Sequence, residues 1–421
     1  MTPTKRHAAR TVALLAAISI AGTVGFSTSA PGATKAKTTP SNNFPTLKPA
    51  TGPVFTIGMT NTEGAAGGLD YPQIRTMAQG SVDYLNKHGG MGGRKIKLEA
   101  CVVKASPETS AACAQELVGK KVDAVLLGLD IFPGYQTFDA ASIPVFGVLP
   151  ILPGDYTANA LVFGGGNATS MAATAAAAKI HYNAKSVSIV AADNPGTAGT
   201  VASLSGSLAK AGIKFKVVKG GDNETDAGYQ GLMREAAKDN PDVIVSLYGD
   251  AGCIGTIRGR ASLGIKIPVL STIICAGADV RKAVGDDLLG WAFPGAQTDK
   301  TTPERAILQA IAAPVLKVKV ADVDPGALSL GVLGIQGIMT LAEHANRMKT
   351  KKIAVTGPSL FSFIKASRGT NAWPNGASLE CGAVPSYSAV CAFTFPVAEY
   401  TKDGNVTIPG LEKVDTKPYL P

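Results

Sequence analysis

Residues 84–102 constrain the fold most, because a helix must end and a strand must begin within this short stretch. Apolar residues recur at helical spacing from about residue 72, and Gly89 and Gly90 then end the helix, since glycine adopts left-handed backbone angles without steric cost. Further on, Ile96 and Leu98 alternate with charged side chains, as a half-buried strand requires. A helix that returns directly to a strand is typical of an α/β sheet.

The same alternation of strands and helices runs through most of the chain, which has 421 residues and is too long for one typical core. The expected strands of a first series are 54–60, 95–102, 122–127 and 144–149, and those of a second series are 187–191, 215–218, 243–248 and 269–272. Each series has helical segments between its strands. The sequence therefore predicts an α/β protein of two doubly wound lobes.

The segments after residue 300 can also be assigned to these two lobes. Helices predicted over 303–316 and 326–348 have no strands of their own, so we expect them to cover the first lobe. A hairpin is predicted over 393–408, around the turn 402–405. The predicted boundaries are 54–163 plus 296–373 for lobe 1, 164–295 plus 374–410 for lobe 2, and 411–421 for a C-terminal tail.

The N-terminus has the pattern of an export signal. Three basic residues precede the apolar run 11–26, and small residues follow it up to Ala30. The run is too short for a comfortable membrane span. No cysteine precedes Cys101, so a lipid anchor is not expected, and the protein is either released outside the cytoplasm or held by an uncleaved signal. Residues 31–53, rich in Pro, Thr, Ser, Lys and Ala, are predicted to be a flexible linker.

The charge of the chain does not indicate a nucleic-acid partner. The formal net charge of +9 falls to +6 when Lys5, Arg6 and Arg10 of the signal are left out. The remaining basic residues are mixed with acidic ones and form no basic runs. We expect a basic, exported, monomeric protein that binds no nucleic acid.

The six cysteines of an exported chain predict disulfides. Fifteen connectivities are possible for six cysteines. We favour the local one, because each pair would join adjacent elements. It pairs Cys101 with Cys113, Cys253 with Cys275, and Cys381 with Cys391. A metal site is not expected, because no CxxC occurs and the four histidines are scattered.

Enzyme and cofactor motifs are weak. Gly164, Gly165 and Gly166 precede a helix whose N-terminus could attract an anion, but the next residues match neither a dinucleotide-binding nor a phosphate-binding loop. These glycines are better explained as a hinge between lobes. No serine lies in a G-x-S-x-G elbow, and no histidine has a context that implies a triad. We expect no cofactor and no enzyme activity, with a hydrolase as the minor alternative.

Two α/β lobes joined by chain crossings predict a cleft between them, and ligands of open α/β sheets bind beyond the carboxyl ends of the strands. The segments that follow the predicted strands therefore supply the candidate site. From lobe 1 they contribute Thr60, Asn61, Asp130, Ile131, Phe132, Pro133, Leu149 and Ile151, and from lobe 2 Asn194, Thr197, Tyr248, Asp250, Ile273 and Ile274.

The helix-to-strand stretch also carries a family resemblance. Its pattern Asn86-x-x-Gly89-Gly90-x-x-Gly93-x-Lys95 resembles the signature of type I periplasmic binding proteins of the leucine/isoleucine/valine-binding family. Three further segments are similar to the family in order and spacing, namely 57–60, 114–118 before 122–125, and 241–244 before a Tyr-Gly pair. The resemblance covers roughly residues 54–410. It implies two lobes joined by three crossovers, and capture of a solute for an ABC importer.

The sequence departs from this family where amino-acid binders hold their ligand. Family members bind the ligand carboxylate with Ser/Thr residues after the third and fourth strands, whereas these segments here are 130–134 and 149–152, with mainly apolar side chains. The family's tyrosine corresponds approximately to Thr197, and its acidic residue falls near Ile273-Ile274-Cys275. Burying an unpaired ammonium or carboxylate costs several kcal/mol, which argues against a zwitterionic amino acid.

The departures predict a more apolar ligand. The six residues Ile131, Phe132, Leu149, Ile151, Ile273 and Ile274 would line the cleft, with Asp130, Asn194, Thr197, Tyr248 and Asp250 as polar contacts at its rim. The hypothesis is a hydrophobic or aromatic small molecule, for example a carboxylic acid or a sterol or terpenoid breakdown product. Lobe closure would use hinges near 164–166, 294–295 and 373–376. A ligand-sensing module that signals to a membrane receptor is the alternative role.

Overall fold

The computed structural model describes residues 48–65, 69–296, 299, 302–324, 328, 330–368, 370–372 and 377–421. The predicted signal 1–30, most of the predicted linker and the predicted hinge at 373–376 lie outside these residues. Strand β1 already begins at Gly52, and the backbone of Lys48 donates to the Lys87 carbonyl oxygen over 3.0 Å. The ordered fold thus starts before residue 54, the predicted end of the linker.

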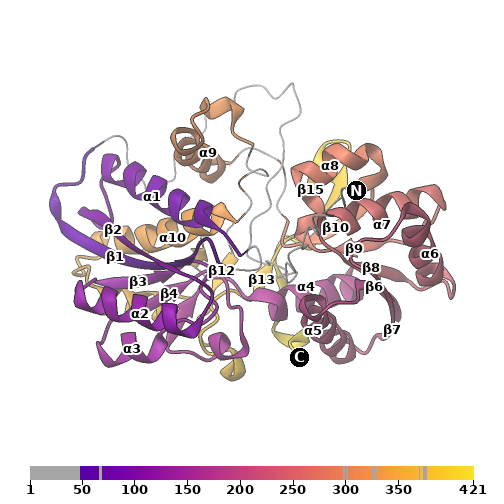
Figure 1. The fold of residues 1–421 in the computed structure, drawn as a ribbon, viewed down its shortest axis with the longest axis horizontal. Coiled ribbons are helices and arrows are strands. Elements are labelled where there is room, and N and C mark those ends of the chain that lie inside the picture. The colour runs from indigo at the N-terminus through magenta and orange to yellow at the C-terminus, as the bar shows by residue number, and fades with distance from the viewer. Residues whose placement is uncertain are drawn as a thin grey trace, which may run out of the picture.

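The chain forms two α/β lobes that lie side by side, with β12, β13 and helix α4 between them (Figure 1). Lobe 1 has a five-stranded parallel sheet in the order β2-β1-β3-β4-β5. Its strands are β1 (Gly52–Thr62), β2 (Arg94–Val103), β3 (Ala124–Leu127), β4 (Val145–Gly147) and β5 (Ala160–Val162). The two-lobed α/β fold predicted from the sequence is confirmed.

Helices cover both faces of the first sheet, since alternate residues of its strands point to different cores. Leu126 packs with the helices α1 (Pro72–Lys87), α9 (Pro303–Leu316), α10 (Gly331–Thr350) and α11 (Gly357–Ala366). Its neighbours Val125 and Leu127 pack instead with α2 (Pro107–Gly119) and α3 (Tyr135–Ala140). The late helices α9, α10 and α11 therefore pack on the lobe formed by the early strands.

Lobe 2 has a seven-stranded sheet in the order β15-β14-β10-β9-β8-β6-β7. Its parallel strands are β6 (Ser186–Ala192), β7 (Lys214–Gly220), β8 (Val243–Leu247), β9 (Val269–Ser271) and β10 (Trp291–Pro294), and β14 (Val397–Thr401) and β15 (Gly404–Thr407) add an antiparallel hairpin at one edge. One face is covered by α4 (Gly166–Ile180) and α5 (Pro195–Ala211), the other by α6 (Asp226–Ala237), α7 (Asp250–Ser262) and α8 (Ala278–Val284).

Each sheet has one strand more than the sequence predicted, counting the hairpin over 393–408 with lobe 2. In lobe 2, the prediction missed β10, whose residues Trp291, Ala292 and Phe293 are all fully buried. Pro294, predicted as part of a hinge, is the last residue of this strand and pairs with Val397.

The region between the lobes has a small core of its own. Beyond the hairpin of β11 (Thr370–Ala372) and β12 (Ala377–Leu379), the chain pairs with lobe 1, because the Cys391 amide donates to the Val162 carbonyl oxygen over 2.9 Å. Strand β13 (Thr394–Phe395) pairs with β16 (Val414–Asp415) near the C-terminus. Phe393 and Leu420 pack together beneath α4. The predicted C-terminal tail is thus part of the packed fold.

The signature stretch has a structural explanation. The Asn86 side chain at the end of α1 donates to the Ile96 carbonyl oxygen over 2.9 Å and accepts from the Ile96 amide over 2.8 Å, which ties α1 to β2. Gly90 has a φ of +69°, and a Cβ there would overlap the Arg94 carbonyl group. The motif therefore fixes a tight helix-to-strand return.

The three disulfides join the pairs that the sequence predicted. They are Cys101–Cys113, Cys253–Cys275 and Cys381–Cys391, with Cα–Cα distances of 5.6, 5.3 and 3.7 Å. The second lies within lobe 2, and the third lies in the segment that pairs with β5 between the lobes.

Candidate functional site

The candidate site consists of the segments that follow the carboxyl ends of the parallel strands. In a parallel sheet these ends share one edge, so residues far apart in sequence come together there. In lobe 1 the relevant segments follow β1, β3 and β4, which are neighbours in the sheet. In lobe 2 they follow β6, β8 and β9, which are also neighbours.

Asp130 organises the segment after β3. Its side chain is 2% exposed, and its Oδ1 accepts from the Ser110 hydroxyl over 2.7 Å and from the Phe132 amide over 3.1 Å. Ser110 belongs to α2, so Asp130 points toward the helix layer of lobe 1. The carboxylate predicted as a polar contact at the rim is therefore an internal group that holds the loop.

A second buried carboxylate, which the sequence prediction missed, organises the segment after β4. Asp155 is 4% exposed, and its Oδ2 accepts from the amides of Ile151 and Leu152 over 2.7 and 2.8 Å. Burial raises the pKa of this carboxyl group, and the two amide hydrogen bonds oppose the shift. The sequence signal was Pro153 at the first position of a short turn with an aspartate two residues later.

The two lobe 1 segments are joined by Tyr135, which the prediction also missed. Its hydroxyl group donates to Asp155 Oδ1 over 3.0 Å, although Tyr135 itself begins α3, which follows the β3 segment. Burial is the main cause that raises the pKa of Tyr135, followed by the charge of Asp155. The phenol thus stays protonated and remains a hydrogen-bond donor.

The two loops that Asp130 and Asp155 hold, which follow β3 and β4, expose large apolar side chains. Phe132 and Leu152 are each 38% exposed, and each backbone amide is bonded to a buried carboxylate. Ile131 and Ile151 are half-buried and pack against the lobe 1 core. Leu149, which was predicted to line the cleft, is 8% exposed and belongs to that core.

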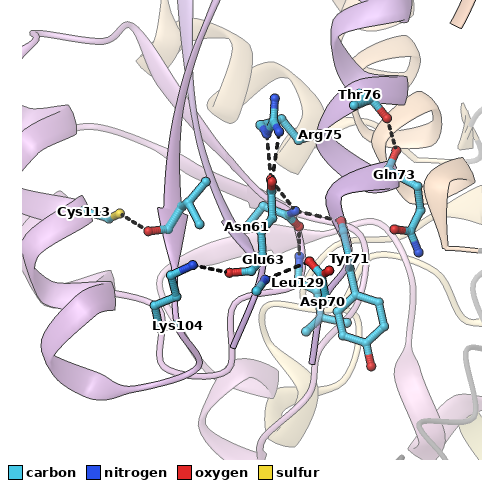
Figure 2. Close-up of polar contacts among 12 residues, drawn as sticks. Asn61, Glu63, Asp70, Tyr71, Gln73, Arg75, Thr76, Lys104, Cys113 and Leu129 are labelled. Carbon is cyan, nitrogen blue, oxygen red and sulfur yellow. Dashed lines mark hydrogen bonds and ion pairs between the residues drawn. The ribbon is translucent and has the colours of Figure 1, made fainter. Parts of the chain in front are cut away.

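Thr60 and Asn61, predicted as ligand contacts, are fully buried at the end of β1. Figure 2 shows the Asn61 amide group at the centre of a network, where it donates to Glu63 over 3.1 Å and to the Tyr71 carbonyl oxygen over 2.9 Å. Its oxygen accepts from the Leu129 amide over 3.1 Å. Asn61 therefore connects three segments of lobe 1, and its hydrogen-bonding groups are occupied by the protein itself.

Asn194 and Thr197 lie at the start of α5, after β6. The Asn194 Oδ1 accepts from the Thr197 amide over 2.8 Å, which makes Asn194 the N-cap of the helix, and its side-chain amide donates to Asp222. Thr197 is 1% exposed. These two residues complete the start of α5, and their role as ligand contacts stays a prediction.

Tyr248, after β8, is also internal. It is 2% exposed, its ring meets that of Tyr229 edge-on at 5.6 Å, and its hydroxyl group donates to the Gly221 carbonyl oxygen over 3.3 Å. The Cys253–Cys275 disulfide ties the start of α7 to the segment after β9. Ile273 and Ile274 in that segment are half-buried against the lobe 2 core. Asp250 is the first residue of α7, and its side chain lies outside what the structure describes.

Two surface pockets are lined by residues that the structure describes. One, of about 450 Å³, lies beside the held loops of lobe 1 and is lined by residues such as Pro133, Tyr135, Asp139 and Asn159. The other, of about 520 Å³, is lined by Pro241, Asp242 and 265–268, which precede β8 and β9 and so lie at the edge opposite the candidate site. Among the described residues, no group of three or more His, Cys, Asp or Glu side chains could hold a metal ion.

Comparison with known proteins agrees with this architecture. The family model described as "Periplasmic binding protein" matches residues 54–366, and the chain therefore belongs to that family. No curated protein is similar enough in sequence to match. In the part of the chain that the structure covers, no helix is long and apolar enough to cross a membrane.

Solved structures share the fold at low sequence identity. An ABC transporter substrate-binding protein from Sphaerobacter thermophilus has a TM-score of 0.66 and 16% identity over 86% of this chain and 98% of its own. A solute-binding protein of an ABC transporter from R. palustris in complex with benzoate has a TM-score of 0.57 and 16% identity over 86% and 97% of the two chains. The branched-chain amino acid transporter substrate-binding protein LivJ from Streptococcus pneumoniae, in complex with isoleucine, has a TM-score of 0.56 and 14% identity over 84% of this chain and 100% of its own.

Proposed function

We propose that this protein is an extracytoplasmic solute-binding protein that captures a small apolar or aromatic molecule between its lobes for an ABC importer. Membership of the periplasmic binding protein family supports a solute-binding role and an exported location. This family consists of binding proteins, which is consistent with a function without catalysis. The apolar ligand class and the ABC importer partner are proposed in addition to this solute-binding role.

The observation that carries the ligand class is the exposure of Phe132 and Leu152 on neighbouring loops, at 38% each. Large apolar side chains held at a surface mark binding sites when they are clustered. The two loops follow adjacent strands of one parallel sheet, so their exposed residues share an edge. An apolar ligand that covers them would recover the free energy of burying these side chains.

The lobe 2 side supports the same ligand class. Around the position where an amino-acid binder has its acidic anchor, Ile273 and Ile274 are half-buried and Cys275 is in a disulfide. None of these residues can pair with an ammonium group, and an unpaired buried ammonium group costs several kcal/mol. The fold itself does not select the ligand, because a benzoate-bound and an isoleucine-bound protein resemble this chain with nearly equal TM-scores of 0.57 and 0.56.

Binding is tested by thermal shift and calorimetry with benzoate, cyclohexanecarboxylate and the uncharged benzamide, next to leucine and isoleucine. A ligand that binds only the folded protein raises its melting temperature. We expect a response to the ring compounds and none to the two amino acids, and benzamide shows whether a carboxylate is needed. Tight leucine binding without a response to the ring compounds would contradict the proposal.

Substitutions locate the site. Phe132→Ala and Leu152→Ala should each weaken binding about three- to sixfold, since full burial of such a side chain is worth about 1.5–3 kcal/mol and a ligand can cover only the exposed part. Phe215→Ala and Ile353→Ala are matched controls, because both side chains are 40% exposed and lie on strand β7 and after α10, away from the candidate loops. Equal losses in the controls would place the site elsewhere.

The importer role is separated from a sensing role by uptake of the identified ligand in cells. An importer component predicts that uptake of labelled ligand falls when the protein is deleted. A sensor predicts unchanged uptake and a lost transcriptional or signalling response.

A further inference from the structure

The loops that expose Phe132 and Leu152 are held by an unusual pair of buried carboxylates. Asp130 and Asp155 are 2% and 4% exposed, and each accepts the backbone amide of the exposed apolar residue in its own loop. The Leu152 amide donates to Asp155 over 2.8 Å, and the Phe132 amide donates to Asp130 over 3.1 Å. Each loop therefore pairs an exposed apolar side chain with a buried anchor.

Both anchors are themselves fixed by a hydroxyl group. Ser110 on α2 donates to Asp130 over 2.7 Å, and Tyr135 on α3 donates to Asp155 over 3.0 Å. Because Tyr135 follows the loop of Phe132, its bond to Asp155 joins the two loops. A rotation of either loop would have to break a hydrogen bond to a buried carboxylate.

Ordinary turn capping does not account for this arrangement. An aspartate that only caps a turn works equally well at the surface, where its carboxylate stays hydrated. Here the carboxylates are removed from water, which costs free energy unless hydrogen bonds compensate. The protein accepts this cost at two adjacent loops, both of which follow strands that end at the candidate site.

We propose that Asp130 and Asp155 are positioning residues that set the affinity of the candidate site, by fixing the backbones that carry Phe132 and Leu152, with Tyr135 coupling the two loops. The role in affinity rests on the proposed function. A preformed apolar surface binds more tightly than a mobile one, because less conformational freedom is lost on binding.

The test combines amide hydrogen exchange with calorimetry, using benzoate and cyclohexanecarboxylate as probes. In Asp155→Ala, the amides of Ile151 and Leu152 should exchange at least tenfold faster, and probe affinity should fall at least tenfold. Asp130→Ala should do the same at the Phe132 amide. Asp155→Asn keeps an oxygen acceptor and should restore most of the affinity.

Asp139→Ala is the matched control, because Asp139 is exposed and its carboxylate accepts from the Asn159 side chain over 2.6 Å. It should change neither readout. Tyr135→Phe retains the ring and removes only the bond to Asp155, so it remains informative if an alanine variant does not fold. We expect faster exchange at Leu152 and a fewfold loss of affinity.

The outcomes separate the two proposals. If the Ile151 and Leu152 amides exchange at the wild-type rate in Asp155→Ala, Asp155 does not hold the loop, whatever ligand the protein binds. Faster exchange with wild-type affinity overturns the role in binding. If the wild-type protein binds neither probe, the proposed ligand class fails and the role in affinity with it, whereas exchange still decides whether the carboxylates hold the loops.

Discussion

The two lobes fix the segments after their strands by different chemistry. Lobe 1 uses the buried carboxylates of Asp130 and Asp155, which accept backbone amides. Lobe 2 uses a helix cap at Asn194 and the Cys253–Cys275 disulfide. In both lobes the polar groups of these segments are bonded within the lobe, and the lobe 1 segments also expose Phe132 and Leu152. In lobe 1, the groups that hold these segments are therefore different from the apolar side chains that the segments expose.

The largest effect is expected when the disulfide of lobe 2 is removed. Replacing Cys253 and Cys275 together by alanine should lower the free energy of unfolding by about 3 kcal/mol, because the crosslink no longer restricts the unfolded chain. Urea unfolding measures this, and amide exchange over 272–277 should increase. The Cys101/Cys113 double variant is the control for lobe 1. It should leave exchange over 272–277 unchanged, and an equal increase there would contradict a local role for the lobe 2 disulfide.

The next largest effect is a loss of folding stability at acid pH, which we expect to arise in lobe 1. His344 in α10 is fully buried, and burial lowers its pKa to about 4. The unfolded chain binds this proton below about pH 6.5, so stability is lost as the pH falls from 6.5 through 4, by about 2 kcal/mol at pH 5. Urea unfolding at pH 7.5 and 5 should show the loss in the wild-type protein.

The loss at acid pH should shrink in His344→Gln. His181→Gln is the control in lobe 2, because that side chain is exposed. If the glutamine variant of His344 loses as much stability between pH 7.5 and 5 as the wild type does, the acid sensitivity has another origin.

A smaller effect distinguishes a helix cap from a ligand contact in lobe 2. Asn194→Ala should cost about 1 kcal/mol of stability, since the cap of α5 is lost. Asn194→Ser keeps a capping oxygen and should retain most of that stability. Thermal unfolding and calorimetry with benzoate are compared. Weaker binding at unchanged stability would make Asn194 a recognition residue after all.

The smallest effect concerns the ion pair at the end of β1 in lobe 1. Arg75 Nε lies 2.6 Å from Glu63, and the Arg75 side chain is 35% exposed (Figure 2). Arg75→Ala should cost no more than about 0.5–1 kcal/mol, because solvent screens such pairs. The loss should shrink further in 1 M salt. A loss above 2 kcal/mol, or one unaffected by salt, would contradict the screening of this pair by solvent.

Much of the fold could be predicted from local patterns. The helix predicted over 303–316 is α9 at Pro303–Leu316, and the C-terminal hairpin is found in β14 and β15. Strand β10 (Trp291–Pro294) escaped prediction, and its last residue was assigned to a hinge because Pro294 and Gly295 are typical of a break between elements. The candidate site was less predictable, since Tyr135 and Asp155 act through a contact across 20 residues of sequence.

The sequence by itself determined the α/β alternation, the family signature between Asn86 and Lys95, the local disulfide pairs and the apolar character of the segments after β3 and β4. Only the tertiary structure decided which partners the polar residues of the predicted site bond to. Asn61 bonds to Leu129 across 68 residues, and Tyr248 bonds to Gly221 across 27. A buried polar group takes whichever partner the folded chain brings to it, and local sequence does not specify that partner.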